Sequence, residues 1–276
     1  MCDYLNEPFD LESEALASAY DEVPYWSFHF GNLILDNVRL KPNTTALDIG
    51  FGTGYPLLEL SQRLGKGSTV YGIDFWEAAA KRARFKAETL GIENVVFVDG
   101  DGADMSFEDE KFDLIVSNVG INNFKDPLTV YRECHRVAKP GAQVAFSTNP
   151  TGHMAEFYDV FQETLIRYDL MSVLAEAAAE EKHRDSAEEI GAELTRAGFT
   201  VSRILEGRFT WRFADGSAFF NHHVIKRVFV PAWAKIVPEE YRAQIFKKME
   251  KIITKLAARF GEFHVTVPTA YIEAEK

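Results

Sequence analysis

The sequence has few cysteines, no long apolar run and no concentration of positive charge. Only Cys2 and Cys134 occur among 276 residues, which excludes a disulfide framework and a thiolate metal site and favours two inert thiols. No apolar stretch reaches the roughly 18–20 residues that span a bilayer, so membrane insertion is not expected. Residues 1–9 are polar and acidic and lack the features of a signal peptide, which favours a cytoplasmic protein.

The charge balance is acidic. Lys and Arg number 30 against 42 Asp and Glu, which gives a formal charge of −12. A general nucleic-acid surface needs a stripe of Lys and Arg that displaces counterions from phosphates, and none is visible. DNA and RNA are therefore not expected partners, whereas a small molecule is. The oligomeric state stays open, a homodimer included.

Short β-branched runs alternate with longer amphipathic stretches through the first two thirds of the chain. Strands are expected over 45–49, 69–73, 95–98, 112–117 and 143–148, and helices over 57–64, 76–90 and 127–137. Strand, helix and strand at this spacing predict a parallel sheet with helices on both faces. Lys139-Pro140-Gly141 is expected to punctuate the step into the fifth strand.

The last third departs from this alternation. A helix is expected over 186–197, then a strand over 199–205, and a final strand over 265–274 that Pro268 interrupts near its start. Two long segments, 151–183 and 207–262, carry apolar residues at helical spacing and are predicted helical insertions. These residues are Met154, Phe157, Phe161, Leu165 and Tyr168 in the first segment, and Tyr241, Ile245, Met249, Ile252, Leu256 and Phe260 in the second. Core packing accounts for most such stripes.

A glycine-rich loop follows the first expected strand, in the run LDIGFGTG over 47–54. Gly50, Gly52 and Gly54 leave the backbone N–H groups open to a ligand at the start of a helix. The dinucleotide fingerprint would need a glycine at position 55, where Tyr55 stands, and the lysine of a phosphate loop is absent. Asp48, two residues before the first glycine, would repel a pyrophosphate but suits a zwitterionic amino-acid tail.

Further polar residues follow the next strands. Asp74 ends the second, Asp101-Gly102 follows the third, and Asn118 closes the fourth. In open α/β sheets this carboxyl edge binds ligands, and a carboxylate at Asp74 can accept bonds from both ribose hydroxyls of an adenosine. Each residue also has a plainer interpretation, because Asp74 can cap the next helix, Phe75 can pack rather than stack on adenine, and Asp101 can belong to an ordinary turn. Together they predict an adenosyl ligand.

At this point the chain resembles the class I S-adenosyl-L-methionine (SAM)-dependent methyltransferases, specifically the group of ubiquinone/menaquinone-biosynthesis C-methyltransferases. The resemblance covers about 20–198. It rests on LDIGFGTG (47–54), YGID (71–74), GDGADMSF (100–107), FDLIVSNVGINNFKDP (112–127), ECHRVAKPGAQVAFS (133–147) and AGF (197–199). It implies an α/β, Rossmann-like, mostly parallel seven-stranded sheet with helices on both faces and an antiparallel last strand. The insertions then follow strands five and six.

The resemblance also implies a domain plan and site residues. One domain over 1–276 would comprise an N-terminal helical lid (1–43), a SAM-binding core (44–150) and substrate-side insertions (151–183 and 207–262). In it, Asp48 and Gly50, Gly52 and Gly54 would surround the methionine part with Asn118 near its amino group, Asp74 would hold the ribose, and Asp101 with Gly102 the adenine. Tyr20 and Trp26 lie in a region that often folds over the cofactor in this family, although aromatic packing of a small helix explains them equally well.

The expected reaction is methyl transfer by in-line displacement at the sulfonium, to a small apolar or aromatic acceptor. Because the donor supplies most of the activation, no catalytic side chain is obligatory and none is assigned. The candidate bases are the histidines His29, His135, His153, His183, His222, His223 and His264. Adjacent His222 and His223 would not face each other on a helix, so no metal site is expected.

The acceptor pocket is expected to come from the two insertions, unless they only thicken the core or form a dimer surface. Asn122-Asn123 stands where the quinone enzymes usually carry a His-rich pair, and both insertions are larger than theirs. The resemblance therefore leaves the acceptor unnamed. Two other classes of protein stay open. An NAD-dependent oxidoreductase would need the dinucleotide fingerprint with a glycine at position 55. A non-catalytic SAM-binding protein would lack an acceptor pocket.

Overall fold

The computed structural model describes residues 3–6 and 10–276, so Cys2 lies outside the described residues. The chain divides into two compact units. The first, here the core unit, comprises Asp10–Asn149, Asp185–Gly207 and Thr269–Lys276. The second, here the insertion unit, comprises Pro150–Arg184 and Arg208–Pro268 together with residues 3–6. The two expected insertions therefore pack together, and the long strands β6 and β7 run through both units.

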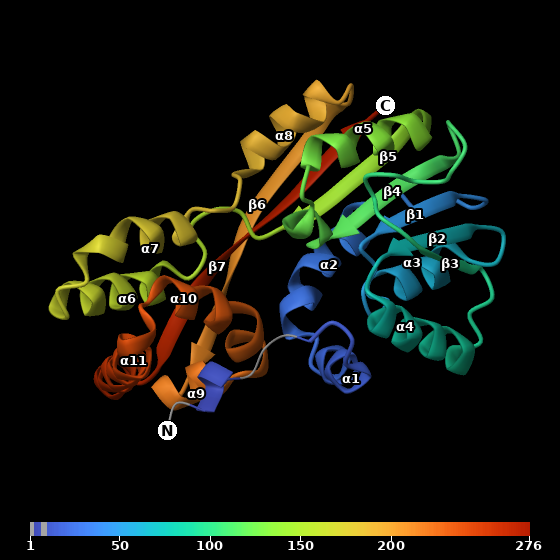
Figure 1. Ribbon diagram of the computed structural model, residues 1–276. Coiled ribbons are helices and arrows are strands. Elements are labelled where there is room, and N and C mark those ends of the chain that lie inside the picture. Colours follow the sequence, from blue (N-terminus) through green and yellow to red (C-terminus); the bar gives the residue numbers. More distant parts are fainter. Residues whose placement is uncertain (1–2, 7–9) are drawn as a thin grey trace. The chain divides into compact units, whose positions relative to one another are not determined.

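The sheet has seven strands in the order β3-β2-β1-β4-β5-β7-β6 (Figure 1). The strands are β1 (Thr45–Ile49), β2 (Thr69–Asp74), β3 (Val95–Asp99), β4 (Phe112–Asn118), β5 (Ala138–Thr148), β6 (Thr200–Phe213) and β7 (Phe263–Glu275). Strands β1 to β5 pair in parallel, and β7 is antiparallel to β5. The expected Rossmann-like sheet with an antiparallel last strand is confirmed.

Helices cover both faces of this sheet because its central strands are buried on both sides. The core unit contains α1 (Glu14–Glu22), α2 (Tyr25–Asn37), α3 (Leu57–Leu64), α4 (Glu77–Leu90), the 3-10 turn η2 (Gly120–Asn123), α5 (Pro127–Val137) and α8 (Ala187–Arg196). Ile115 and Val144 pack with residues of α5 and α8. Their neighbours Leu114 and Ala145 pack instead with residues of α2, α3 and α4. This alternation is the period of two expected for a strand between two helical layers.

Three expected strand limits are wrong. Lys139-Pro140-Gly141 lies within β5, where the register with β4 shifts after Phe112, and so does not precede the strand. Strand β6 continues beyond position 205 to Phe213, although most of its residues are exposed. Its second half alternates Phe209, Trp211 and Phe213 with polar residues, a strand pattern that the expected limit missed. Pro268 lies inside β7 without ending it.

The insertion unit is helical apart from its parts of β6 and β7. It contains η1 (Asp3–Asn6), α6 (Ala155–Arg167), η3 (Met171–Val173), α7 (Leu174–Glu181), α9 (Gly216–Asn221), the π-helical turn η4 (Ile225–Phe229), α10 (Val230–Ile236) and α11 (Glu239–Phe260). Both inserted segments build one aromatic core. Phe157 of α6 stacks on Trp233 of α10 with 3.8 Å between ring centroids, and on Phe219 of α9 at 5.3 Å.

The expected apolar stripe of α11 is only partly buried. Ile245 and Met249 are fully buried as expected, whereas Tyr241 and Phe260 are exposed. The buried face continues instead through Ile253. Among the described residues, no helix combines the length and the apolar character that crossing a membrane requires.

Candidate functional site

The polar residues expected at the carboxyl edge of the sheet lie on adjacent parallel strands. Asp74 at the end of β2 is in register with Asp99 of β3, and Asn118 at the end of β4 with Ser147 of β5. Asp48 of β1 lies between β2 and β4. Asp48, Asp74 and Asn118 are buried although they are polar. Such burial is costly unless the groups have partners, so the bonds of each one decide its role.

The glycine loop turns the chain from β1 into α3 in a conformation that glycine favours. Gly50, Gly52 and Gly54 have φ angles of 76°, 52° and 99°, in the left-handed region that other residues avoid. Gly50 N–H donates to the carbonyl of Ile73 at 2.8 Å. A Cβ atom at Gly50 would lie 3.3 Å from Gly120 Cα. The loop therefore has the backbone freedom that the sequence predicted. The expected open N–H groups are not present, because those of Gly52 and Gly54 also donate within the protein, to Asp74 Oδ2 and to the Phe51 carbonyl.

Asp74 ties the glycine loop to the turn after β2. Its Oδ2 accepts the Gly52 N–H at 2.6 Å, and its Oδ1 accepts the Trp76 N–H at 2.8 Å. Burial raises the pKa of this carboxyl, and the N–H groups of Trp76, Gly52 and Phe75 act in the opposite direction. The helix-cap interpretation is wrong, because Trp76 is the N-cap residue of α4. A carboxylate oxygen accepts about two hydrogen bonds, so each oxygen retains capacity for a ligand hydroxyl.

Asp48 is the buried carboxyl group that lacks a partner. It is 0% exposed, and neither of its oxygens has a partner with hydrogen-bond geometry among residues 3–6 and 10–276. The nearby Leu57 N–H lowers its pKa but does not offset the effect of burial. Burial, followed by the charge of Asp74, raises its pKa to about 8. An unpartnered buried carboxyl group costs stability and fits a site that a positively charged ligand completes.

Asn118 joins three parts of the core unit. Its Nδ2 donates to the Ser27 carbonyl of α2 at 3.2 Å and to the Tyr55 carbonyl at 3.5 Å. Its Oδ1 accepts the Ser147 hydroxyl at 3.0 Å. Ser117 next to it donates to the Ile49 carbonyl at 2.6 Å. The end of β4 is thereby fixed against the glycine loop and the first turn of α2.

The residues expected at the adenine lie after β2 and β3. Asp101 Oδ1 accepts the Ala103 N–H at 2.9 Å, so its plainer role in a turn is present in the structure. Gly102 is buried, and a Cβ atom there would lie 2.9 Å from Ile49 Cγ2, so a larger residue would not fit without a shift. The Phe75 side chain is 68% exposed, which leaves its ring free of the core packing that the alternative interpretation required.

The N-terminal helices carry the two aromatic residues that the sequence named as possible cofactor contacts. Tyr20 of α1 packs edge-on against Trp76 at 5.9 Å between ring centroids. Trp26 of α2 is buried against Phe30 at 5.4 Å. Both rings thus take part in packing, and whether they also cover a cofactor stays a prediction.

Asp21 anchors α1 to α4 and to the glycine loop. Its carboxylate accepts hydrogen bonds from Arg82 at 2.8 Å and from Lys86. Burial alone would raise the pKa of Asp21, but Lys86, Arg82 and the Thr53 side chain lower it on balance. No local sequence signal marks Asp21, because its partners lie on elements far along the chain.

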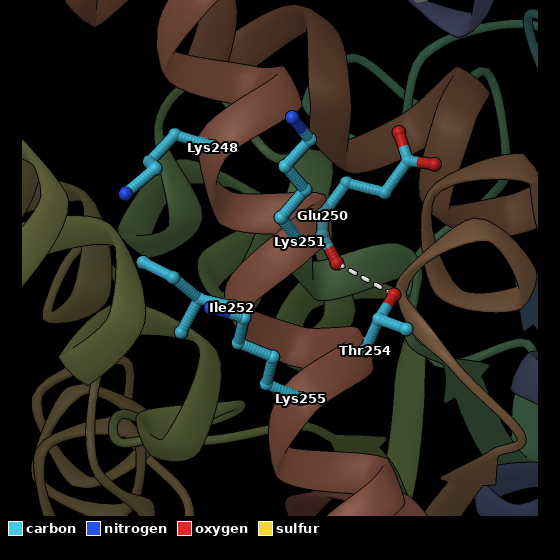
Figure 2. A pocket seen from close by; sticks show the side chains of 6 residues that line it. All are labelled: Lys248, Glu250, Lys251, Ile252, Thr254 and Lys255. Atoms are coloured by element: carbon cyan, nitrogen blue, oxygen red, sulfur yellow. Dashed lines mark hydrogen bonds between the residues drawn. The ribbon is translucent and has the colours of Figure 1, made fainter.

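A surface hollow of about 290 Å³ lies along α11 in the insertion unit and contains none of the expected site residues (Figure 2). It is lined by Lys248, Glu250, Lys251, Ile252, Thr254 and Lys255. The Thr254 hydroxyl donates to the Glu250 carbonyl at 2.8 Å within the helix. The hollow lies on the surface of a single helix.

Known proteins match the chain in both sequence and fold. Residues 40–198 match the family model described as a methyltransferase domain. The demethylmenaquinone methyltransferase of Geobacillus kaustophilus (strain HTA426) is 30% identical over 178 residues, which cover 60% of this chain and 75% of that protein. The demethylmenaquinone methyltransferase of Staphylococcus aureus (strain JH9) is 36% identical over 111 residues, or 40% of this chain and 45% of that protein.

Solved structures agree with these sequence matches. The crystal structure of a SAM dependent methyltransferase from Aquifex aeolicus superposes with a TM-score of 0.54 and 25% sequence identity. The match covers 70% of this chain and 92% of that one. The sheet, the glycine loop and the buried carboxyl groups described above therefore occur in a chain that matches methyltransferases by two independent criteria.

Proposed function

Because this chain belongs to the methyltransferase domain family, as a class I SAM-dependent enzyme of the menaquinone/ubiquinone type, we propose that it methylates a small apolar or aromatic molecule. The observation that carries this proposal is the 30% identity to a demethylmenaquinone methyltransferase, whose name specifies an acceptor with a naphthoquinone ring. The aromatic core of the insertion unit is in keeping with such an acceptor.

The residues of the core unit fit SAM. Asp48, with two oxygens that lack partners among the described residues, and the glycine loop would hold its methionine part, with Asn118 beside them. Asp74 would hold the ribose, since each of its oxygens accepts one bond from the protein and can accept another. Asp101, Gly102 and Phe75 would face the adenine. These assignments are supported by burial, bonding capacity and the shape of the loop.

SAM supplies an electrophilic methyl group on a positively charged sulfur. The protein then has to hold donor and acceptor in line and exclude water, and good alignment alone contributes about 7–11 kcal/mol in intramolecular models. The fixed contacts of Asp74 with Gly52 and of Asn118 with Ser27 would provide such a rigid frame. A base is needed only where the acceptor must lose a proton, and we assign no catalytic residue.

The carboxyl group of Asp48 makes SAM binding dependent on pH. Its pKa of about 8 in the folded protein lies above the ordinary value of 3.8. A cationic ligand favours the ionised form, so binding below pH 8 should release a proton from Asp48. The affinity should therefore rise up to about tenfold per pH unit between pH 6 and 7 and level off above pH 8. Without SAM, the stability that Asp48 contributes is present below pH 4 and lost as the pH rises through 8.

Calorimetric titration with SAM in buffers of different ionisation enthalpy measures this proton directly. Asp48→Asn is the matched variant, because it keeps the size of the side chain but cannot titrate, so the proton that Asp48 releases is the difference between the two proteins. Equal proton release by the wild type and the variant would show that Asp48 does not meet the ligand.

Incubation with SAM and 1,4-naphthalenediol, followed by detection of S-adenosylhomocysteine, tests the proposed function. We expect release that requires both compounds and that falls in the Asp48→Asn variant. A panel that adds aliphatic amines and amino acids provides the contrast. Turnover of these compounds without turnover of any aromatic acceptor would refute the proposed acceptor class and leave the methyltransferase assignment intact.

A further inference from the structure

One histidine of the insertion unit is buried without a partner. His153 lies in the turn before α6 and is 0% exposed. Neither of its ring nitrogens has a hydrogen-bond partner among the residues that the structure describes. Burial, with the nearby charges of His183 and Arg184, lowers its pKa to about 3, so the ring is neutral at physiological pH. A neutral imidazole has one N–H donor and one nitrogen acceptor, and both are unused here.

A second unused donor lies next to this ring. The Tyr158 hydroxyl accepts the Trp233 Nε1–H at 3.1 Å, and its own proton has no recorded acceptor among the described residues. Tyr158 is 1% exposed, and its ring centroid lies 6.1 Å from that of His153, with the ring planes at 90°. Two neighbouring buried side chains thus offer two donors and one acceptor.

The surroundings of these two groups are aromatic. The His153 ring centroid lies 5.9 Å from that of Phe229, which in turn stacks on Trp233 at 5.7 Å. The His183 ring packs edge-on against the His153 ring, with 5.7 Å between the ring centroids. His183 lies in the coil after α7, and its side chain is 36% exposed, so it is the partly exposed member of the group.

Filling the core does not explain His153. A phenylalanine would fill a similar volume without two buried polar atoms, each of which costs about 1–3 kcal/mol when unsatisfied. Buried polar groups without partners are rare, and each calls for an explanation beyond packing. In an aromatic setting, an oxygen atom on an apolar ring would supply a partner for these donors and this acceptor.

We propose that His153 and Tyr158 bind the oxygen of an uncharged aromatic molecule that carries a hydroxyl or carbonyl group. This inference rests on the proposed function, because that molecule would be its methyl acceptor. The neutral imidazole accepts the proton of a hydroxyl or donates to a carbonyl, and the Tyr158 hydroxyl donates to the same oxygen. Phe229 and Trp233 contact the ring.

The test measures binding of 1,4-naphthalenediol under reducing conditions by calorimetry. The comparison ligand is 1,4-dimethoxynaphthalene, which cannot donate a hydrogen bond. We expect His153→Phe to weaken diol binding about tenfold or more and to weaken binding of the dimethoxy compound less, because its oxygens accept hydrogen bonds but cannot donate them. His153→Gln, which keeps a donor and an acceptor, should retain part of the affinity. Exposed His264→Phe is the matched control and should bind like the wild type.

The melting temperature separates a binding role from a structural one. His153→Phe should raise it, because the variant removes two unsatisfied polar atoms. A higher melting temperature with unchanged diol affinity would overturn the proposal. If His153→Phe fails to fold, unchanged binding by His153→Gln and Tyr158→Phe would overturn it, and weaker binding by Tyr158→Phe would support it. A wild type that binds no diol also overturns it, while S-adenosylhomocysteine release with another acceptor would leave the methyltransferase activity established.

Discussion

Replacing Asp74 by alanine should weaken SAM binding by about 2–3 kcal/mol, or roughly 30- to 160-fold. The expected loss has two sources. The variant removes the carboxylate that would accept the ribose hydroxyls, and it also frees the Gly52 N–H that now donates to Asp74 Oδ2 at 2.6 Å. Titration calorimetry with SAM measures the first effect, and thermal unfolding in the absence of SAM measures the second.

Asp99→Ala is the matched control for this prediction. Asp99 is in register with Asp74 on the neighbouring strand β3, but it is exposed and pairs with Arg84 at 2.8 Å. It should bind SAM like the wild type and lose less than about 1 kcal/mol of stability, as expected for a surface ion pair. Equal SAM affinity in both variants would exclude the ribose role of Asp74.

Replacing Phe157 by alanine should lower the free energy of unfolding by about 3–5 kcal/mol, the usual range for a buried phenylalanine. Phe157 is fully buried and its ring contacts Trp233, Phe219 and Phe161. Its removal would leave a cavity among large rings that cannot close around a methyl group. Urea unfolding followed by tryptophan fluorescence and by circular dichroism gives the value.

Phe260→Ala makes the same chemical change on the surface of the same unit, because Phe260 is 66% exposed. It should change stability by no more than about 0.5 kcal/mol. Similar losses in the two variants would mean that the aromatic core of the insertion unit does not depend on Phe157.

The sequence was sufficient for the parallel half of the sheet because its signals are local there. β1 is a short buried strand followed by three glycines at a fixed spacing, and Asp74 ends β2 at the same edge. Gly50, Gly52 and Gly54 have positive φ angles, which glycine adopts more readily than any other residue. The fold class and the use of SAM followed from such runs together with the family resemblance.

Other features depend on contacts between distant parts of the chain. The second half of β6 is an exception, because Phe209, Trp211 and Phe213 alternate there with polar residues and a local strand pattern was present. The buried face of α11 passes through Ile253 rather than Phe260, because the neighbouring helices determine which stripe is covered. Asp21 accepts a hydrogen bond from Arg82, and the two residues are too far apart in the chain for a local sequence pattern to predict it. His153 differs from the other histidines by complete burial, which only the fold reveals.

A crystal structure of the protein with S-adenosylhomocysteine tests the central claim most directly. The account predicts that both ribose hydroxyls donate to the Asp74 carboxylate at about 2.5–3.0 Å, with the amino-acid tail on the glycine loop beside Asp48. Asp74 should keep its bond to the Trp76 N–H in that complex. Adenosyl density elsewhere in the molecule, or a ribose without contact to Asp74, would contradict the account.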